Sequence, residues 1–292
     1  MAIILIVMAI ILGFLFILAA VFGSYLMGNG KMEIILHALP LEGTAILGGA
    51  IGAMIIGNSM LVVKKGLKAL GGAFKGPKFK KQDYIDLLKI MYELVKVAKQ
   101  KGLIALEPHI ENPHESEIFQ KYPKIAHDHF AAEFICDTFR MITMSLEDPY
   151  QIEDHMQKQL DKHHHEALEG PHVYQNMADG LPAIGIVAAV LGVVKTMASI
   201  DAEVVILGEM IGGALVGTFF GVFMAYCLVG PLANKMTQIA EEESLYYNII
   251  RDVMVGYLHG QAVQVALETG RGGIPSHLQP TFLELEEQLN AI

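Results

Sequence analysis

The sequence has little cysteine, few charged residues and none of the common catalytic or nucleotide-binding signatures. Only two of its 292 residues are cysteines, Cys136 and Cys227, and their wide separation indicates no disulfide framework, which is typical of a reduced, cytoplasmic setting. Acids outnumber bases to give a net charge of -10, which argues against nucleic acid as a partner. The patterns GxxxxGKS/T, HExxH and GxSxG are absent, so we expect neither an enzyme nor a bound cofactor.

The histidines are numerous, but their spacing does not suit a metal site. His163, His164 and His165 are consecutive, and consecutive helical residues point about 100° apart, so the three cannot converge on one ion. His127 and His129 have no clear cysteine or carboxylate partner at ligand spacing. We predict that these histidines lie on exposed polar helices and bind no metal.

What the sequence has instead is long runs without charge. Residues 1–22 contain no polar side chain, and residues 43–63 and 210–234 contain no charged one. Each run is long enough to cross a bilayer as a helix. The alternative interpretation of residues 1–22 is a cleaved signal peptide, against which stand the length of the run and the lack of a basic residue before it.

A fourth apolar run is shorter. Residues 181–194 are 14 residues without a polar side chain, preceded by Asp179 and closed by Lys195. As a helix they extend about 21 Å, which is short of a hydrocarbon core of about 30 Å. Such a run is typical of a buried helix in a soluble protein, or of a membrane helix whose ends do not meet lipid. Because three clear spans accompany it, we predict that residues 181–200 form a fourth transmembrane helix.

Lysine marks one side of the predicted membrane. Residues 64–81 contain seven lysines and no acid, whereas Lys31 is the only lysine or arginine in the connection 23–38. By the positive-inside rule the lysine-rich side is cytoplasmic, and both termini lie on the same side. A polybasic patch that binds anionic membrane lipid is the alternative, and it implies the same orientation.

The predicted fold class is therefore an all-α membrane protein with four transmembrane helices. A helical cytoplasmic domain lies between helices 2 and 3, and a cytoplasmic tail follows helix 4. Helices 1 and 2 occupy residues 1–63, the cytoplasmic domain 64–170, helices 3 and 4 171–235, and the C-terminal tail 236–292. No sustained alternation of apolar and polar residues indicates a strand.

Within the cytoplasmic domain, residues 83–100 repeat apolar side chains at helical spacing. The charged residues of the opposite face, which we expect to be solvated, are Asp86, Lys89, Glu93 and Lys96. Two further helices are predicted over residues 125–146 and 150–168, and the second is expected to end before Gly170-Pro171.

Small residues recur about four apart on three of the predicted spans, a spacing that lets helices approach closely. They are Gly48 and Gly52 on helix 2, Gly185 and Ala189 on helix 3, and Gly208, Gly212, Gly213, Gly217 and Gly221 on helix 4. We predict dense packing within or between subunits. The alternative is that glycine is simply frequent in membrane helices.

The prolines and acids point to an ion path that this chain does not complete alone. Pro182 is predicted to begin helix 3 and Pro231 to end helix 4, which favours a bend or gate near the cytoplasmic surface, although a proline in a first turn is also ordinary. Glu42 and Glu209 are expected near the outer ends of their helices, which leaves Thr218 as the only polar side chain near the middle of helix 4. Because an intramembrane ion path needs a titrating group, a partner chain has to supply it.

Six stretches carry a family resemblance. They are GLIALE at 102–107, ENPHESEIF at 111–119, ADGLPAIGIVAAVLGVVK at 178–195, LVGTFFGVFMAY at 215–226, GPLA at 230–233 and PTFLELEE at 280–287. On these motifs the chain resembles the MotA family, the larger stator subunits of bacterial flagellar motors, over essentially its full length. ExbB and TolQ, which have three spans and energise outer-membrane processes with protons, are the alternative.

The resemblance implies an inner-membrane protein that forms a homo-oligomer, as a pentamer, around a dimer of MotB-like subunits. The B subunit supplies the ion-binding aspartate, and the cytoplasmic domain of the A subunit pushes on the rotor protein FliG. The rotor-facing charges of the family fall on Lys99, with Lys101 nearby, and on Glu107. Arginine is common in the family where Lys99 stands, and lysine keeps the charge without the bidentate fork.

The resemblance also implies an ion path. The two family prolines fall on Pro182 and Pro231, and the hydroxyl of the path falls on Thr218. Sodium-driven relatives carry a second threonine where this chain has Ala189. We therefore expect protons, rather than sodium, to be the coupling ion.

Overall fold

The computed structural model describes residues 2–144 and 148–292 of the chain. These residues form helices and turns with no strand among them, which confirms the all-α prediction. Their contacts divide the chain into two compact units, Met1–Gly76 with Glu166–Ile239 and Pro77–His165 with Ala240–Ile292. We call the first the apolar unit and the second the polar unit. Division of the chain at residues 63, 170 and 235 follows membrane topology, and it stays a prediction.

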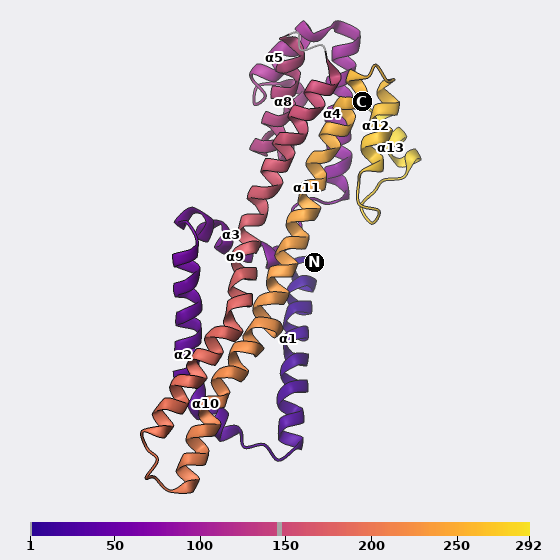
Figure 1. The fold of residues 1–292 in the computed structure, drawn as a ribbon. Helices are drawn as coiled ribbons and strands as arrows, with labels where there is room; N and C mark the ends of the chain where they lie inside the picture. The colour runs from indigo at the N-terminus through magenta and orange to yellow at the C-terminus, as the bar shows by residue number, and fades with distance from the viewer. Residues whose placement is uncertain (1, 145–147) are drawn as a thin grey trace. The chain divides into compact units, whose positions relative to one another are not determined.

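The apolar unit consists of long helices, shown in Figure 1. They are α1 (Ala2–Met27), α2 (Met32–Gly57), α3 (Met60–Lys75), the later part of α9 (Pro149–Met197), α10 (Val204–Met224), the π-helix η2 (Ala225–Val229) and the start of α11 (Gly230–Leu258). Four helical stretches are long and apolar enough to cross a membrane: Ile4–Met27, Met32–Gly57, and segments of Pro149–Met197 and Val204–Leu258. None of the apolar window of the first is buried in the chain, as expected for a helix whose solvent is lipid.

The second span differs from the charge-free run that predicted it. The helix α2 covers 32–57 rather than 43–63, so it includes Glu42. It ends at Asn58, and Ser59 then caps α3 by accepting a hydrogen bond from the Val62 amide, because a serine hydroxyl satisfies an otherwise unpaired helix-terminal N–H. The absence of charge therefore placed both ends of this span too late in the chain.

The helix α9 also contradicts a prediction. It is a single helix of 49 residues that contains both Pro171 and Pro182, so no helix ends before Gly170-Pro171. Each proline leaves one carbonyl of the preceding turn without its amide donor. The helix nevertheless continues, and near Pro171 it packs against α3. A Cβ at Gly170 would lie 2.9 Å from the Ala69 Cβ, so the absence of a side chain there lets α3 pack closely against α9. The neighbouring Glu169 forms an ion pair with Lys65 of α3 at 2.7 Å.

The polar unit consists of shorter helices around one hydrophobic core. They are α4 (Lys81–Lys101), the 3₁₀ helix η1 (Leu103–Leu106), α5 (Glu107–Glu111), α6 (Glu117–Gln120), α7 (Pro123–Ala126), α8 (His129–Thr143), the early part of α9, the later part of α11, α12 (Val263–Gly272) and α13 (Phe282–Asn290). The predicted helix 125–146 is thus broken at His127-Asp128, where Asp128 caps α8, and residues 145–146 of that prediction lie outside the described residues.

The helix α4 forms the centre of this core. Its predicted apolar stripe, Ile85, Leu88, Met91, Val95 and Ala98, is buried throughout. One residue of the predicted solvated face is buried as well, because Glu93 is only 8% exposed. Its carboxylate accepts hydrogen bonds from the Tyr122 hydroxyl at 2.8 Å and from the Lys121 ammonium at 2.5 Å. These partners remove the penalty that would otherwise exclude a carboxylate from the interior.

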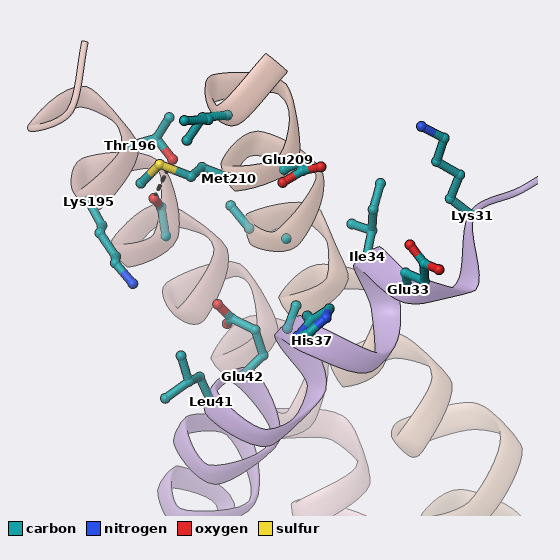
Figure 2. Close-up of a pocket in the computed structure, with 15 residues that line it drawn as sticks. Lys31, Glu33, Ile34, His37, Leu41, Glu42, Lys195, Thr196, Glu209 and Met210 are labelled. Atoms are coloured by element: carbon teal, nitrogen blue, oxygen red, sulfur yellow. Dashed lines mark hydrogen bonds between the residues drawn. The ribbon is translucent and has the colours of Figure 1, made fainter. Parts of the chain in front are cut away.

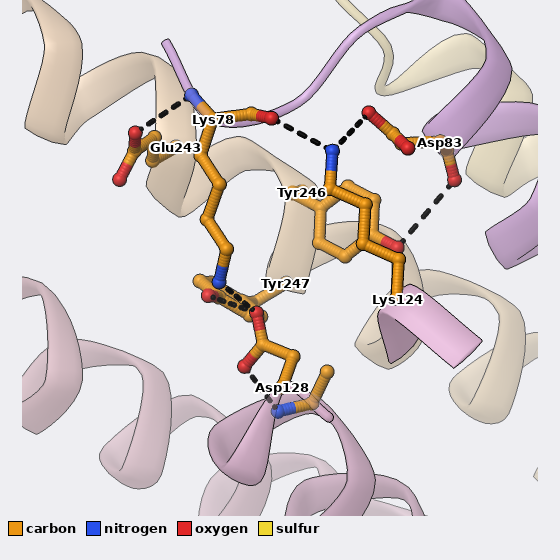
Figure 3. Close-up of polar contacts among 8 residues, drawn as sticks. Lys78, Asp83, Lys124, Asp128, Glu243, Tyr246 and Tyr247 are labelled. Atoms are coloured by element: carbon orange, nitrogen blue, oxygen red, sulfur yellow. Dashed lines mark hydrogen bonds and ion pairs between the residues drawn. The ribbon is translucent and has the colours of Figure 1, made fainter. Parts of the chain in front are cut away.

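A polar network joins three distant stretches of the polar unit (Figure 3). The Asp128 carboxylate, 7% exposed as a residue, accepts from the Lys78 ammonium at 2.6 Å and from the Tyr247 hydroxyl at 3.1 Å, and it caps α8 through the Ala131 amide. The Lys78 amide in turn donates to Glu243 at 2.8 Å. Segment 77–80, the start of α8 and the α11 helix are therefore held by one buried carboxylate.

Candidate functional site

The helices α9 and α10 touch backbone to backbone in the apolar unit. A Cβ built on Gly221 would lie 2.7 Å from the Leu181 carbonyl oxygen and 2.9 Å from the Gly185 Cα, distances that real Cβ atoms do not adopt. A Cβ on Gly185 would lie 2.9 Å from the Gly217 carbonyl oxygen. The prediction of close packing through small residues is confirmed for this pair of helices, where the added atoms would meet rigid backbone.

The other small residues divide into two groups. A Cβ on Gly192 would lie 2.7 Å from the Ala214 Cβ, which extends the close approach of α9 and α10, and one on Gly212 would lie 3.2 Å from Ile34 of α2. In contrast, the chain places nothing within 4 Å of a Cβ at Gly48, Gly52 or Gly208. Packing within this chain therefore explains only part of the glycine pattern.

One of the two residues expected in the ion path, Ala189, lies at the contact between α9 and α10. Ala189 is 9% exposed, and its amide nitrogen lies 3.2 Å from the position of a Cβ on Gly217. Thr218 is the next residue of α10 and is half-buried. The structure therefore packs Ala189 against Gly217, the residue that precedes Thr218 in α10.

The two prolines do not begin and end helices as predicted. Pro182 lies inside α9, one residue after the Leu181 carbonyl that Gly221 approaches. Pro231 is the second residue of α11 and follows the π-helix 225–229, in which the Gly230 amide donates to the Ala225 carbonyl. A π-turn widens the helix and pairs one donor fewer, so it accommodates a residue that has no N–H. The prolines mark irregular positions within continuous helices rather than their ends.

One acid, Glu42, lies within the second candidate span rather than before it. Glu42 stands well inside α2, about 15 Å along the helix from its first residue. Its Oε2 is 2.7 Å from the position of a Cβ on Gly217, and its Oε1 is 3.6 Å from that of a Cβ on Gly192. The side chain therefore occupies the space that these glycines leave open, beside Ala189. Glu42 is thus the eleventh residue of α2, further inside the span than the charge-free run indicated, while the expectation that no ionisable residue lies near the membrane midplane stays a prediction.

A cavity of about 450 Å³ opens next to Glu42, between α2, α9 and α10 (Figure 2). Besides Glu42, its polar lining includes Lys31, Glu33, His37, Lys195, Thr196 and Glu209. Thr196 is buried and donates to the Gly192 carbonyl at 2.9 Å. No sequence pattern marks this site, because it is built from three helices that are far apart in the chain. The one available signal was Glu42 itself, an acid a few residues before an apolar run.

The charges expected to face a rotor lie together on the polar unit. Lys99 and Lys101 are in the last turn of α4, and Glu107 begins α5, just after the 3₁₀ turn η1. All three are exposed, as is Ile104 of that turn, at 81%. The Lys99 ammonium donates to the carbonyl of Gln261, which fixes the lysine against the connection between α11 and α12.

The histidines and thiols add no second site. Among the described residues, no group of three histidine, cysteine or carboxylate side chains is placed to hold a metal ion. His163 is not exposed as predicted, because its ring stacks on Phe130 with centroids 3.8 Å apart. Both cysteines are free thiols, and burial raises the pKa of Cys136 to about 12, which keeps it protonated and unreactive.

Comparison with known proteins gives the class of this protein. Residues 126–249, which include the α9–α10 contact, match the family model described as the MotA/TolQ/ExbB proton channel family. Residues 11–102 match the model described as Motility protein A N-terminal. The class is therefore that of the proton-channel membrane subunits.

Curated relatives narrow the class further. The chain is 39% identical to Motility protein A of Escherichia coli (strain K12) over 98% of this chain and 96% of that protein. It is 34% identical to Chemotaxis protein LafT of Vibrio parahaemolyticus over 95% and 97% of the two chains. The chain therefore belongs to the motility protein A family. A solved structure of C. jejuni MotAB has the same fold, with a TM-score of 0.70 and 20% identity over 92% of this chain and 96% of that one.

Proposed function

We propose that this chain is the A-type stator subunit of a bacterial flagellar motor. Together with a MotB-like partner it conducts protons across the inner membrane and converts their flow into torque on the rotor protein FliG. The observation that carries the proposal is the 39% identity to a motility protein A over 98% of the chain. Its four apolar spans are inserted with both termini and the polar unit in the cytoplasm, as the lysines of 64–81 favour.

The assembly follows from the same relatives. Solved structures titled as MotAB, from C. jejuni and Bacillus subtilis, share the fold, which supports a B-type partner and a ring of A subunits, taken as a pentamer. The partner contributes the ion-binding aspartate. An ExbB- or TolQ-like energiser of outer-membrane processes is the weaker alternative, because residues 11–102 match the N-terminal model of motility protein A.

The site residues take their roles within this function. Ala189 and Thr218 line the proton path where α9 and α10 touch, and Ala189 supplies no oxygen ligand for sodium, which favours the proton as coupling ion. Pro182 and Pro231 provide the irregular helix positions at which the ring-lining helices bend. The exposed charges Lys99, Lys101 and Glu107 contact the rotor.

The test is a strain in which the gene for this chain is deleted. The deletion should abolish swimming while flagella still assemble, because a stator supplies torque and is not part of the filament. Restoring the chain should restore swimming, and a protonophore should stop it. Cells that lack the gene yet swim normally, or that lose flagella altogether, would contradict the proposal.

The same strain tests the rotor surface. Lys99→Glu together with Glu107→Lys should reduce swimming strongly while membrane insertion and partner binding persist, because both side chains are exposed and act through charge. Either single reversal should give a partial defect, since exposed ion pairs contribute only about 0–1 kcal/mol each. The matched control is Lys158→Glu, an exposed lysine of α9 that lies outside this surface. Equal swimming of the double reversal and the control would remove these residues from the rotor contact.

A further inference from the structure

The cavity beside Glu42 opens at one end of the apolar unit. Its lining contains Lys31 and Glu33 from the start of α2, and Lys195 and Thr196 from the end of α9. The connections 28–31 and 198–203 therefore border the same end as the cavity. Under the proposed topology this is the outer face of the membrane, the side from which protons enter.

Two side chains of opposite charge line this cavity from different helices. Figure 2 shows the Lys195 side chain of α9 and the Glu42 side chain of α2 directed toward the same region of the cavity. Lys195 lines the cavity from the end of α9 and Glu42 lines it from α2. The other titratable groups are Lys31, Glu33 and His37 on α2 and Glu209 on α10, so each of the three helices contributes charge.

Glu42 links this cavity to the expected proton path. Its carboxylate packs beside Gly192, which lines the cavity, and beside Gly217. Gly217 in turn contacts Ala189 and precedes Thr218 in the sequence. A Cβ at Gly217 would lie 2.7 Å from Glu42 Oε2 and displace the carboxylate, whereas one at Gly192 would lie in ordinary contact with Oε1 at 3.6 Å. Glu42 therefore lies beside both the cavity and the α9–α10 contact.

We propose that Glu42 and Lys195 form the cation-discriminating mouth of the proton path, in which Lys195 is the residue that keeps metal cations out. This inference rests on the proposed function and assigns this chain its own titrating group. A proton from cavity water bonds to a carboxylate oxygen of Glu42 and leaves from it to the next acceptor inward, so the carboxylate is regenerated. The Lys195 ammonium, which is covalently fixed to the chain, balances the negative charge of the Glu42 carboxylate that a sodium ion would otherwise neutralise.

The two cations respond differently to this arrangement. A sodium ion must exchange water for fixed oxygen ligands and needs uncompensated negative charge to enter an apolar region. With Lys195 beside the carboxylate that charge is already balanced, and Ala189 offers no further oxygen. A proton instead needs one lone pair and a chain of water, both of which Glu42 and the cavity provide. Removing the ammonium should therefore let sodium occupy the mouth and compete with protons.

The test uses the complete A–B complex in the deletion strain. Rotation speed of tethered cells is measured at fixed external pH while sodium replaces potassium. The wild-type chain and Lys195→Arg should give speeds independent of sodium. With Lys195→Met, sodium should lower the speed by roughly two- to tenfold, because loss of a nearby like charge strengthens cation binding by that order. Adding Glu42→Gln to Lys195→Met should abolish the sodium dependence, even if the motor is slower.

The sodium dependence of these variants tests the roles of Lys195 and Glu42. Sodium-independent rotation with Lys195→Met, or a dependence that survives Glu42→Gln, overturns the proposal. A rise of speed with sodium in Lys195→Met also supports it, since sodium then passes the mouth. Lys195→Gln serves as a second variant, and immunoblots confirm insertion; failure of both variants to insert overturns the proposal by making Lys195 a structural residue. A wild-type chain that restores no rotation at all refutes instead the stator function itself.

Discussion

Replacing Gly221 by alanine is expected to destabilise the packing of α9 against α10 and to abolish motility. The added Cβ would lie 2.7 Å from the Leu181 carbonyl oxygen and 2.9 Å from the Gly185 Cα, and both are backbone atoms that cannot rotate away. Overpacking of this kind costs about 1–3 kcal/mol in well-packed interiors. The measurements are the thermal midpoint of the purified A–B complex and swimming in the deletion strain.

The matched control is Gly208→Ala on the same helix. A Cβ at Gly208 has nothing within 4 Å in this chain, so the substitution adds the same methyl group without a clash. It should also favour the helix slightly, because alanine is a better helix former than glycine. If the two variants have equal stability and equal motility, the backbone contact between α9 and α10 does not support function.

Replacing Asp128 by alanine is expected to destabilise the polar unit by about 2–4 kcal/mol. The substitution removes the cap of α8, leaves the hydroxyl of the buried Tyr247 without its acceptor and frees the Lys78 ammonium. Most of the loss comes from the cap and the hydroxyl, because the Lys78 side chain is 47% exposed and water replaces its partner. The measurement is the denaturation midpoint of the purified complex, followed by the fluorescence of its tyrosines.

Asp154→Ala provides the control for this prediction. Asp154 pairs with Lys158 on the exposed surface of α9, where its side chain is 65% exposed. Such a pair contributes about 0.3–0.5 kcal/mol, so the midpoint should hardly move. Equal shifts for the two variants would mean that Asp128 does not hold segment 77–80, α8 and α11 together.

Regular patterns in the sequence predicted the regular parts of this fold. The apolar repeat of residues 83–100 identified the buried face of α4, and four apolar runs identified four candidate spans. Charged residues were a poor guide to where a membrane span ends and to which helix face meets solvent. The sequence pattern predicts a solvated Glu93, whereas Tyr122 and Lys121 satisfy its carboxylate inside the unit. A sequence shows that a residue is charged but does not show which distant partner compensates that charge.

The same limit applied to the candidate site. Gly185, Gly217 and Gly221 were identified from their spacing, because a four-residue period places them on one face of a helix. The charge-free run begins just after Glu42, and only the three-dimensional packing of α2 places that residue against glycines of α9 and α10. The cavity with Lys195 has no local pattern at all.

Proton flux into lipid vesicles tests most directly whether this chain is a proton-conducting subunit that acts only with a B-type partner. Vesicles carry either the chain alone or the A–B complex, and a potassium diffusion potential drives uptake while an internal dye reports pH. Uptake by the complex, unchanged when sodium replaces an inert organic cation outside at constant potassium and absent from vesicles with the chain alone, is the predicted result. Equal uptake by the chain alone, or no uptake by a complex that restores rotation in cells, would contradict this assignment.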